Sequence, residues 1–198
     1  MVKSLMKRFI RYFIITFILV IFTACSSKKH AEIPLYQYAK FNNLDGVIFA
    51  SKNQAIDTPS PFNKFTSVHY AVENGNLKML EHLIDKGANI EARSKDGDTP
   101  LIRAAYRGDL QIVNYLISKG ADLDAQSKLG ITPLITSAGF DRLNIIKALV
   151  EAGANIEFIS SRGYSAIKVA KAKNNDRIVY YLRLVQIKRE NKKYKEKN

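Results

Sequence analysis

The 198-residue chain contains few of the side chains that build catalytic and metal sites. It has one cysteine and three histidines, and none of these lies near other ligand types at the spacing of a metal site. A single cysteine also excludes an internal disulfide. The main apolar run, Tyr12 to Phe22, has 11 residues, whereas a membrane-spanning helix needs roughly 20. We therefore expect a protein that is not an enzyme and that holds no metal or cofactor.

The N-terminal residues are typical of an export signal. Four basic residues and no acid precede the apolar run "YFIITFILVIF", whose length suits the apolar core of a signal peptide. The "FTAC" that follows resembles the lipobox of bacterial lipoproteins, with Phe22 where that motif usually has Leu. The resemblance implies a signal peptide over 1–24, a lipidated Cys25 and a polar tether over 25–30. An uncleaved signal anchor and an ordinary secretory signal are the alternatives.

A repeat of 33 residues dominates the rest of the chain. The segments that begin at Phe65, Asp98 and Ile131 align without insertion. The equivalent positions include Thr66, Thr99 and Thr132, then Leu83, Leu116 and Leu149, then Gly87, Gly120 and Gly153. A weaker copy follows at "YSAIKVAKAKNNDRIVYYL", and a degenerate copy precedes them at "IPLYQYAKFNNLDGVIFAS". A fixed period of this length indicates a stack of identical structural units.

Each unit predicts two helices and an extended connection. In the copy from Asp98, Thr99 can cap a helix whose first residue is Pro100. Gly108 can end that helix in the left-handed conformation, and Gly120 can end the next one. The following "ADLDAQSKLG" has no helical period, so we expect an extended, turn-rich connection.

The order of these elements, with "TPL" opening the first helix and "GA" closing the second, resembles the ankyrin repeat. The resemblance implies an all-α repeat solenoid of four to five repeats with a period of 33. We expect a degenerate capping repeat over 31–63, three regular repeats over 64–160, a C-terminal capping repeat over 161–187 and a basic tail over 188–198. His69, which matches the histidine of the family motif, is expected to be a hydrogen-bonded core residue.

The resemblance also implies that a partner protein contacts the hairpin tips and the exposed positions of the first helices, which form the concave face. Tyr106, Leu129, Ile131 and Phe140 would place apolar groups on that surface. The residues that match these positions are Lys64, Tyr70, Glu73, Asn74, Lys95, Asp98, Arg103, Tyr106, Arg107, Lys128, Leu129, Ile131, Thr136 and Phe140.

The positive charge is concentrated at the two ends of the sequence. The formal net charge is +13, of which the signal supplies four and the segment from Arg183 a further five, so about +4 remains elsewhere. We therefore expect no nucleic-acid partner. Ile178, Leu182 and Val185 predict an amphipathic helix that runs into a solvated charged end. Contact of that end with anionic lipid or an acidic partner is the alternative.

Taken together, the sequence predicts a monomeric, lipid-anchored protein of the bacterial cell envelope that faces the periplasm and binds a partner protein. Ser26 favours the outer membrane, if the organism has one. A special case is an immunity protein that neutralises a toxin entering the envelope. A structural or trafficking role, or export to act on host proteins, is the alternative class.

Overall fold

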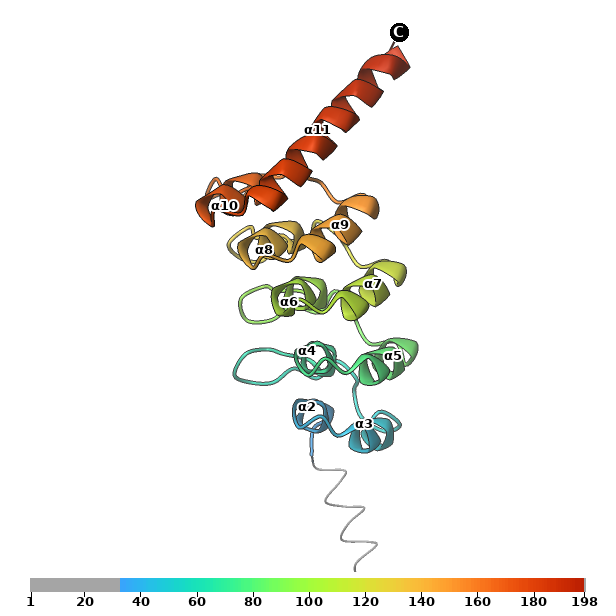
Figure 1. Ribbon diagram of the computed structural model, residues 1–198. Coiled ribbons are helices and arrows are strands. Elements are labelled where there is room, and N and C mark those ends of the chain that lie inside the picture. Colours follow the sequence, from blue (N-terminus) through green and yellow to red (C-terminus); the bar gives the residue numbers. More distant parts are fainter. Residues whose placement is uncertain (1–32, 198) are drawn as a thin grey trace, which may run out of the picture.

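The computed structural model describes residues 33–197, which form ten helices and no strand. The helices stack in pairs, and each pair follows the one before it along a single axis (Figure 1). The first helices of the pairs are α2 (Leu35–Lys40), α4 (Ser67–Glu73), α6 (Pro100–Arg107), α8 (Pro133–Gly139) and α10 (Ala166–Ala172). The second helices are α3 (Leu44–Ala50), α5 (Leu77–Asp85), α7 (Leu110–Ser118), α9 (Leu143–Glu151) and α11 (Asp176–Lys197). The predicted all-α solenoid is confirmed.

The predicted signal peptide, Cys25 and the predicted tether lie outside the described residues. Within residues 33–197, no helix combines the length and the apolar character that a membrane crossing requires.

The first helices begin as the repeated Thr-Pro pair predicts. The Thr99 hydroxyl accepts a hydrogen bond from the Ile102 amide at 3.4 Å, and Pro100 is the first helical residue. Thr132 caps α8 in the same way through the Ile135 amide at 3.3 Å. These caps satisfy amides that have no partner within the helix.

Left-handed residues end the first helices. Gly108 has a φ of 87° at the end of α6. Asp141 and Asn174 occupy the same register in the next two repeats, with φ of 56° and 55°. Acidic and amide residues tolerate this conformation better than other side chains, so the repeat geometry survives the loss of glycine.

The core runs continuously between neighbouring repeats. Ala104 and Ala105 are fully buried where α6 contacts α4 and α8, and their small side chains let the first helices approach closely. Val113 and Leu116 of α7 are fully buried in the same core. Each repeat therefore buries apolar surface against its neighbours as well as between its own two helices.

Extended hairpins connect successive repeats and lie side by side (Figure 1). The Lys95 amide donates to the Asn63 carbonyl at 2.7 Å, and the Lys128 amide donates to the Asp96 carbonyl at 2.9 Å. Gly97 sits at this junction with a φ of 81°, and a Cβ there would lie 2.8 Å from the Lys128 nitrogen. The hairpins are thus tied to one another along one edge of the solenoid.

The two ends of the stack differ from its middle. In the first repeat, α2 and α3 are followed by turns rather than by the regular Gly-Ala junction. At the other end, α11 is 22 residues long. It continues as helix across position 188, where the sequence places the start of a basic tail, and projects beyond the stack (Figure 1).

Candidate protein-binding surface

A row of aromatic rings and one guanidinium crosses the exposed side of the first helices. The Arg103 guanidinium carbon lies 5.5 Å from the Phe65 ring centroid and 4.8 Å from the Tyr106 ring centroid. The Tyr106 ring packs edge to face on Phe140, with centroids 4.5 Å apart. Cation–π and edge-to-face contacts hold these side chains in fixed orientations. The row therefore spans the second, third and fourth repeats.

Ion pairs fix Arg103 in this row. Its Nη2 lies 2.5 Å from Glu73 Oε1, and its Nη1 lies 3.5 Å from Asp98 Oδ2. Arg107 approaches the other Glu73 oxygen at 3.5 Å. Burial raises the pKa of the Asp98 carboxyl, and the charge of Arg103 acts in the opposite direction. Because both partners of the shortest pair are about one-fifth exposed, the pair orients the guanidinium more than it stabilises the fold.

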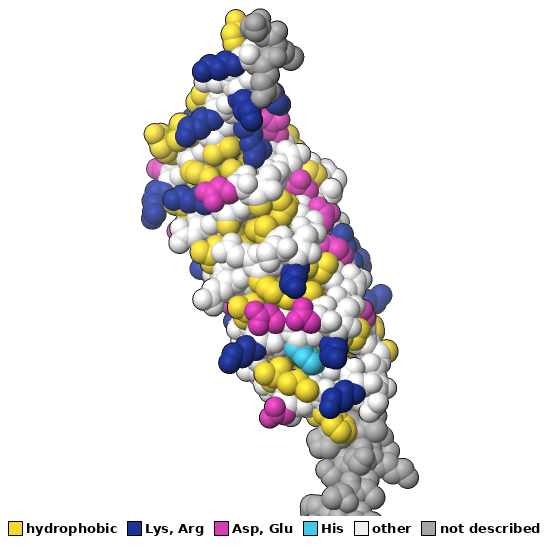
Figure 2. Space-filling model, turned by 90° about the vertical axis from the view of Figure 1, so that its right-hand side faces the viewer, with side chains coloured by type: hydrophobic (Ala, Val, Ile, Leu, Met, Phe, Trp, Pro, Cys, Tyr) yellow, Lys and Arg dark blue, Asp and Glu magenta, His cyan; other side chains and the backbone are white. Residues whose placement is uncertain are grey.

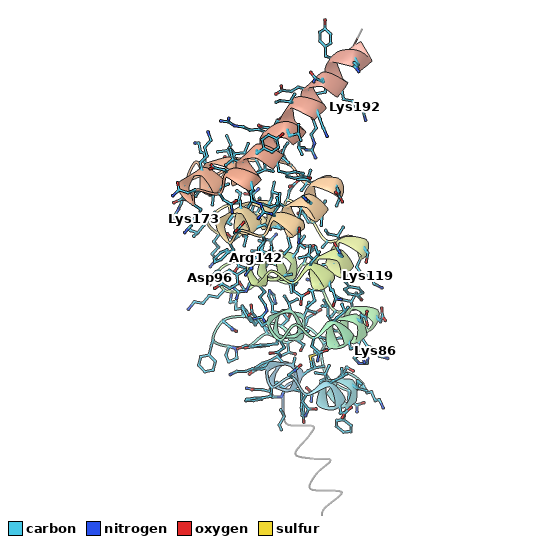
Figure 3. All side chains as sticks on the ribbon, in the orientation of Figure 1. Lys86, Asp96, Lys119, Arg142, Lys173 and Lys192 are labelled. Atoms are coloured by element: carbon cyan, nitrogen blue, oxygen red, sulfur yellow. The ribbon has the colours of Figure 1, made fainter. Side chains whose placement is uncertain are left out.

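A groove of about 410 Å³ lies beside the row, between the hairpins and the first helices of the third and fourth repeats. Ile102 and Ile131 contribute apolar surface, while Asp96 stands at its hairpin side (Figure 3). Eight of the fourteen residues predicted from sequence line this groove: Asp98, Arg103, Tyr106, Lys128, Leu129, Ile131, Thr136 and Phe140. The structure thus brings more than half of the predicted residues into one site.

The remaining six predicted residues lie outside this groove. Lys64, Lys95 and Arg107 are exposed, and Glu73 and Asn74 are half-buried. The Asn74 amide donates to the Ala39 carbonyl at 2.7 Å, so this side chain ties the second repeat to the first.

The predicted surface position of two residues is wrong. Tyr70 is buried because its ring packs between Tyr36 and Phe65 in the junction with the first repeat. Thr136 is buried where α8 begins its second turn, although it still lines the groove.

Comparison with known proteins agrees with this geometry. A family model described as "Ankyrin repeats (3 copies)" matches residues 35–127 and, in a second match, residues 102–192. The chain belongs to the ankyrin repeat family. Membership indicates a protein-interaction module. An 83-residue stretch of the chain is 26% identical to the probable E3 ubiquitin-protein ligase XBOS31 of Oryza sativa subsp. japonica. That stretch is 41% of this chain and spans only 19% of the rice protein.

His69, the histidine of the ankyrin motif, is a buried structural residue. Its Nδ1 lies 3.3 Å from the Thr66 amide nitrogen, and its Nε2 lies 3.1 Å from the Asp98 carbonyl oxygen. Because a backbone amide can only donate, Nδ1 accepts and Nε2 carries the proton that is donated to Asp98. Burial lowers the pKa of His69 to about 4. The predicted role in the core is confirmed.

The ankyrin alignment missed several residues that shape the surface. Phe65 extends the aromatic row, and Asp96, Ile102 and Ser127 line the groove. Their positions follow from how neighbouring hairpins pack, which the pattern of one repeat does not specify. Among residues 33–197, no group of three or more His, Cys, Asp or Glu side chains is arranged to hold a metal ion.

The second helices form a different face of the ankyrin stack. Figure 2 shows basic, acidic and hydrophobic side chains interspersed along the middle of this face. Lys86 and Lys119 lie on this side in Figure 3, and Lys119 approaches Asp85 of the previous repeat at 3.4 Å. The groove and the aromatic row therefore differ in character from the second-helix face.

Proposed function

We propose that this protein is a monomeric, non-catalytic ankyrin module that binds a partner protein through the groove between its third and fourth repeats. One observation carries the proposal. Tyr106 and Phe140 are 42% and 47% exposed, although they are held rigidly by each other and by Arg103. Aromatic and arginine side chains that are fixed in advance dominate the binding energy of protein interfaces.

The groove favours a partner segment with an apolar side chain. Leu129 at the hairpin tip is 45% exposed and faces the same space as Tyr106. A partner that covers Leu129, Tyr106 and Phe140 together would remove their apolar surface from water. Burial of this kind contributes about 25 cal/mol of favourable free energy per Å² of apolar surface. The polar edge formed by Asp96 and Lys128 would then set the orientation of the segment.

We propose in addition that Cys25 carries a lipid that anchors the protein in the bacterial cell envelope, facing the periplasm. The support is the basic N-terminus, the short apolar run and the "FTAC" junction. A special case within this proposal is an immunity protein for an envelope-targeted toxin, which would have one tight partner. Export to act on host proteins requires that Cys25 is not lipidated.

The groove is tested by site-specific crosslinking in the native cells. A photo-crosslinking amino acid at Lys128, which is exposed and lines the groove, captures only what lies there. We expect a defined crosslinked protein that decreases about tenfold or more in Tyr106→Ala. Tyr164→Ala is the matched control, because Tyr164 is a tyrosine of similar exposure that does not line the groove. Equal capture by wild type and Tyr106→Ala would refute the groove as the binding site.

The anchor is tested by the mass of the N-terminal peptide of protein taken from native membranes. We expect residues 1–24 to be absent and Cys25 to carry acyl chains, with no acylation in Cys25→Ala. An intact N-terminus, or a cleaved one with an unmodified thiol, contradicts the lipid anchor.

A further inference from the structure

The net charge of the described residues is distributed unevenly along the chain. Residues 33–160 contain 13 basic and 14 acidic residues, so the N-terminal capping repeat and the three regular repeats are close to neutral. Residues 161–197 contain 12 basic and 3 acidic residues, a formal charge of +9. Lys192 lies on the projecting part of α11 (Figure 3). The excess charge of the solenoid therefore belongs to the last repeat and its long helix.

The helix α11 has two apolar faces on opposite sides. Ile178 and Leu182 are fully buried against the solenoid. On the other side, Tyr180, Ile187 and Tyr194 are 71%, 54% and 73% exposed. Their spacing of seven residues keeps them on one line, with a drift of only about 20° per step. At 1.5 Å per residue this outer stripe is about 21 Å long.

The helix is anchored to the solenoid by Arg189. Its guanidinium donates to the carbonyls of Val150 and Ala154, each at 3.3 Å, at the C-terminal end of α9. A cation there also interacts favourably with the helix dipole. Beyond Arg189, residues 190–195 are exposed. The outer stripe therefore extends along a helix that is held at its base and projects from the stack (Figure 1).

Charged side chains flank the outer stripe on both sides, and most of them are basic. With 100° per residue, Arg183 lies about 40° to one side of Ile187, and Glu190 lies about 40° to the same side of Tyr194. Lys188 and Lys195 lie about 80–100° to the other side of the stripe. All four side chains are exposed. An apolar line between charged side chains is found on helices of coiled coils, in which the flanking charges select the partner.

We propose that the outer stripe of α11 is a second docking surface, which binds an acidic, amphipathic helical segment of another protein. The segment would place apolar side chains along Tyr180, Ile187 and Tyr194 and its carboxylates against the flanking cations. Charge complementarity identifies this occupant. A second copy of α11, with eight basic and three acidic residues, would bring another formal charge of +5 to the same surface, and the two would repel.

The geometry disfavours the other anionic partners. A helix that lies in a membrane surface needs one broad apolar face turned to the lipid, but Ile178 and Leu182 are already covered by the solenoid. Stacked nucleotides repeat at about 3.4 Å per strand, whereas the side chains of the stripe are about 10.5 Å apart. That spacing matches successive heptads, each about two turns long, of a heptad-patterned helix.

The test measures binding of the full chain to a labelled synthetic peptide by fluorescence anisotropy. The peptide is a 28-residue heptad helix (about 28 residues make a stable partner) with Leu at the core positions and Glu at the flanking ones. We expect binding that weakens about tenfold or more in Tyr180→Ala/Ile187→Ala and in Lys188→Glu/Lys195→Glu, and that falls with added salt. A scrambled peptide of the same composition should bind about tenfold more weakly.

The control variant is Tyr106→Ala, which alters the groove and should leave peptide binding unchanged within about twofold. The substituted side chains on α11 are exposed, so thermal melting followed by circular dichroism should be unchanged in the α11 variants. Equal binding of the scrambled peptide would overturn the proposal, since charge alone would then explain it. Tighter binding of duplex DNA or of vesicles with equal phosphatidylcholine and phosphatidylglycerol, lost in the same variants, would overturn it as well.

Discussion

His69 makes the stability of the protein depend on pH. Its Nδ1 accepts from the Thr66 amide and its Nε2 donates to the Asp98 carbonyl, so both ring nitrogens are occupied in the neutral state. Protonation would place a second N–H against the Thr66 amide. The neighbouring charges are Arg103, which lowers the pKa of His69, and Glu73, which raises it, and both effects are smaller than that of burial.

The sign and size of the effect follow from the pKa of His69. The folded value is about 4 and the ordinary value is 6.5. Between pH 4 and pH 6.5 the unfolded chain binds more protons than the folded one. The contribution of His69 to the unfolding free energy is therefore fully present above about pH 6.5 and is lost as the pH falls. A difference of this size corresponds to about 3 kcal/mol between pH 7 and pH 4.

The measurement is the free energy of unfolding in urea from pH 7 to pH 4, for wild type and His69→Ile. Isoleucine is the matched replacement, because Ile102 and Ile135 occupy the same position in the next two repeats and are buried. Burial also raises the pKa of Glu91 and Asp98. Those carboxyls favour the folded state as the pH falls, and they are present in both proteins.

We expect wild type to lose about 1 to 2 kcal/mol more than His69→Ile between pH 7 and pH 5. Parallel curves over this range would show that His69 titrates equally in the folded and unfolded chains, and the reasoning from its burial would then be wrong.

Three further substitutions test the packing of the solenoid. Leu116→Ala should lower the unfolding free energy by about 2–5 kcal/mol in urea, because Leu116 is fully buried; a loss below about 1 kcal/mol would contradict its place in the core. Gly97→Ala should be more destabilising than Gly87→Ala in the same assay. Both glycines have positive φ, but only at Gly97 does a Cβ meet a backbone atom, at 2.8 Å; equal losses would mean that the hairpins separate readily. Arg189→Ala should speed the amide hydrogen exchange of α11, measured by mass spectrometry, and leave that of α7 unchanged. Unchanged exchange in α11 would show that the two carbonyl contacts do not anchor the helix.

Most of the fold could be predicted from the period of 33. The roles of the Thr-Pro pairs, the glycines and the buried leucines can be predicted from one repeat, because each of these residues affects only its own helix or the helix next to it. For this reason the capping of α6 by Thr99, the left-handed end at Gly108 and the structural role of His69 agree with the structure.

The candidate binding surface was only partly predictable, because it depends on contacts between repeats that differ in sequence. Arg103 and Thr136 occupy the position of Tyr70 in the next two repeats, and neither is fully exposed. At Tyr70 the irregular first repeat supplies Tyr36, which packs on its ring. The groove depends on Phe140 leaning on Tyr106 of the previous repeat. In α11 the sequence predicted only the face of Ile178, Leu182 and Val185, which packs against the core, and the outer stripe was not predicted.

The stack of first helices also sets a distance. Four steps separate α2 from α10, and packed helices lie about 8–10 Å apart, so the solenoid spans roughly 32–40 Å between its ends. Each added unit of 33 residues would lengthen it by one such step without altering either end. The number of units thus sets the distance between the first and the last repeat of the stack, as the length of a spacer does.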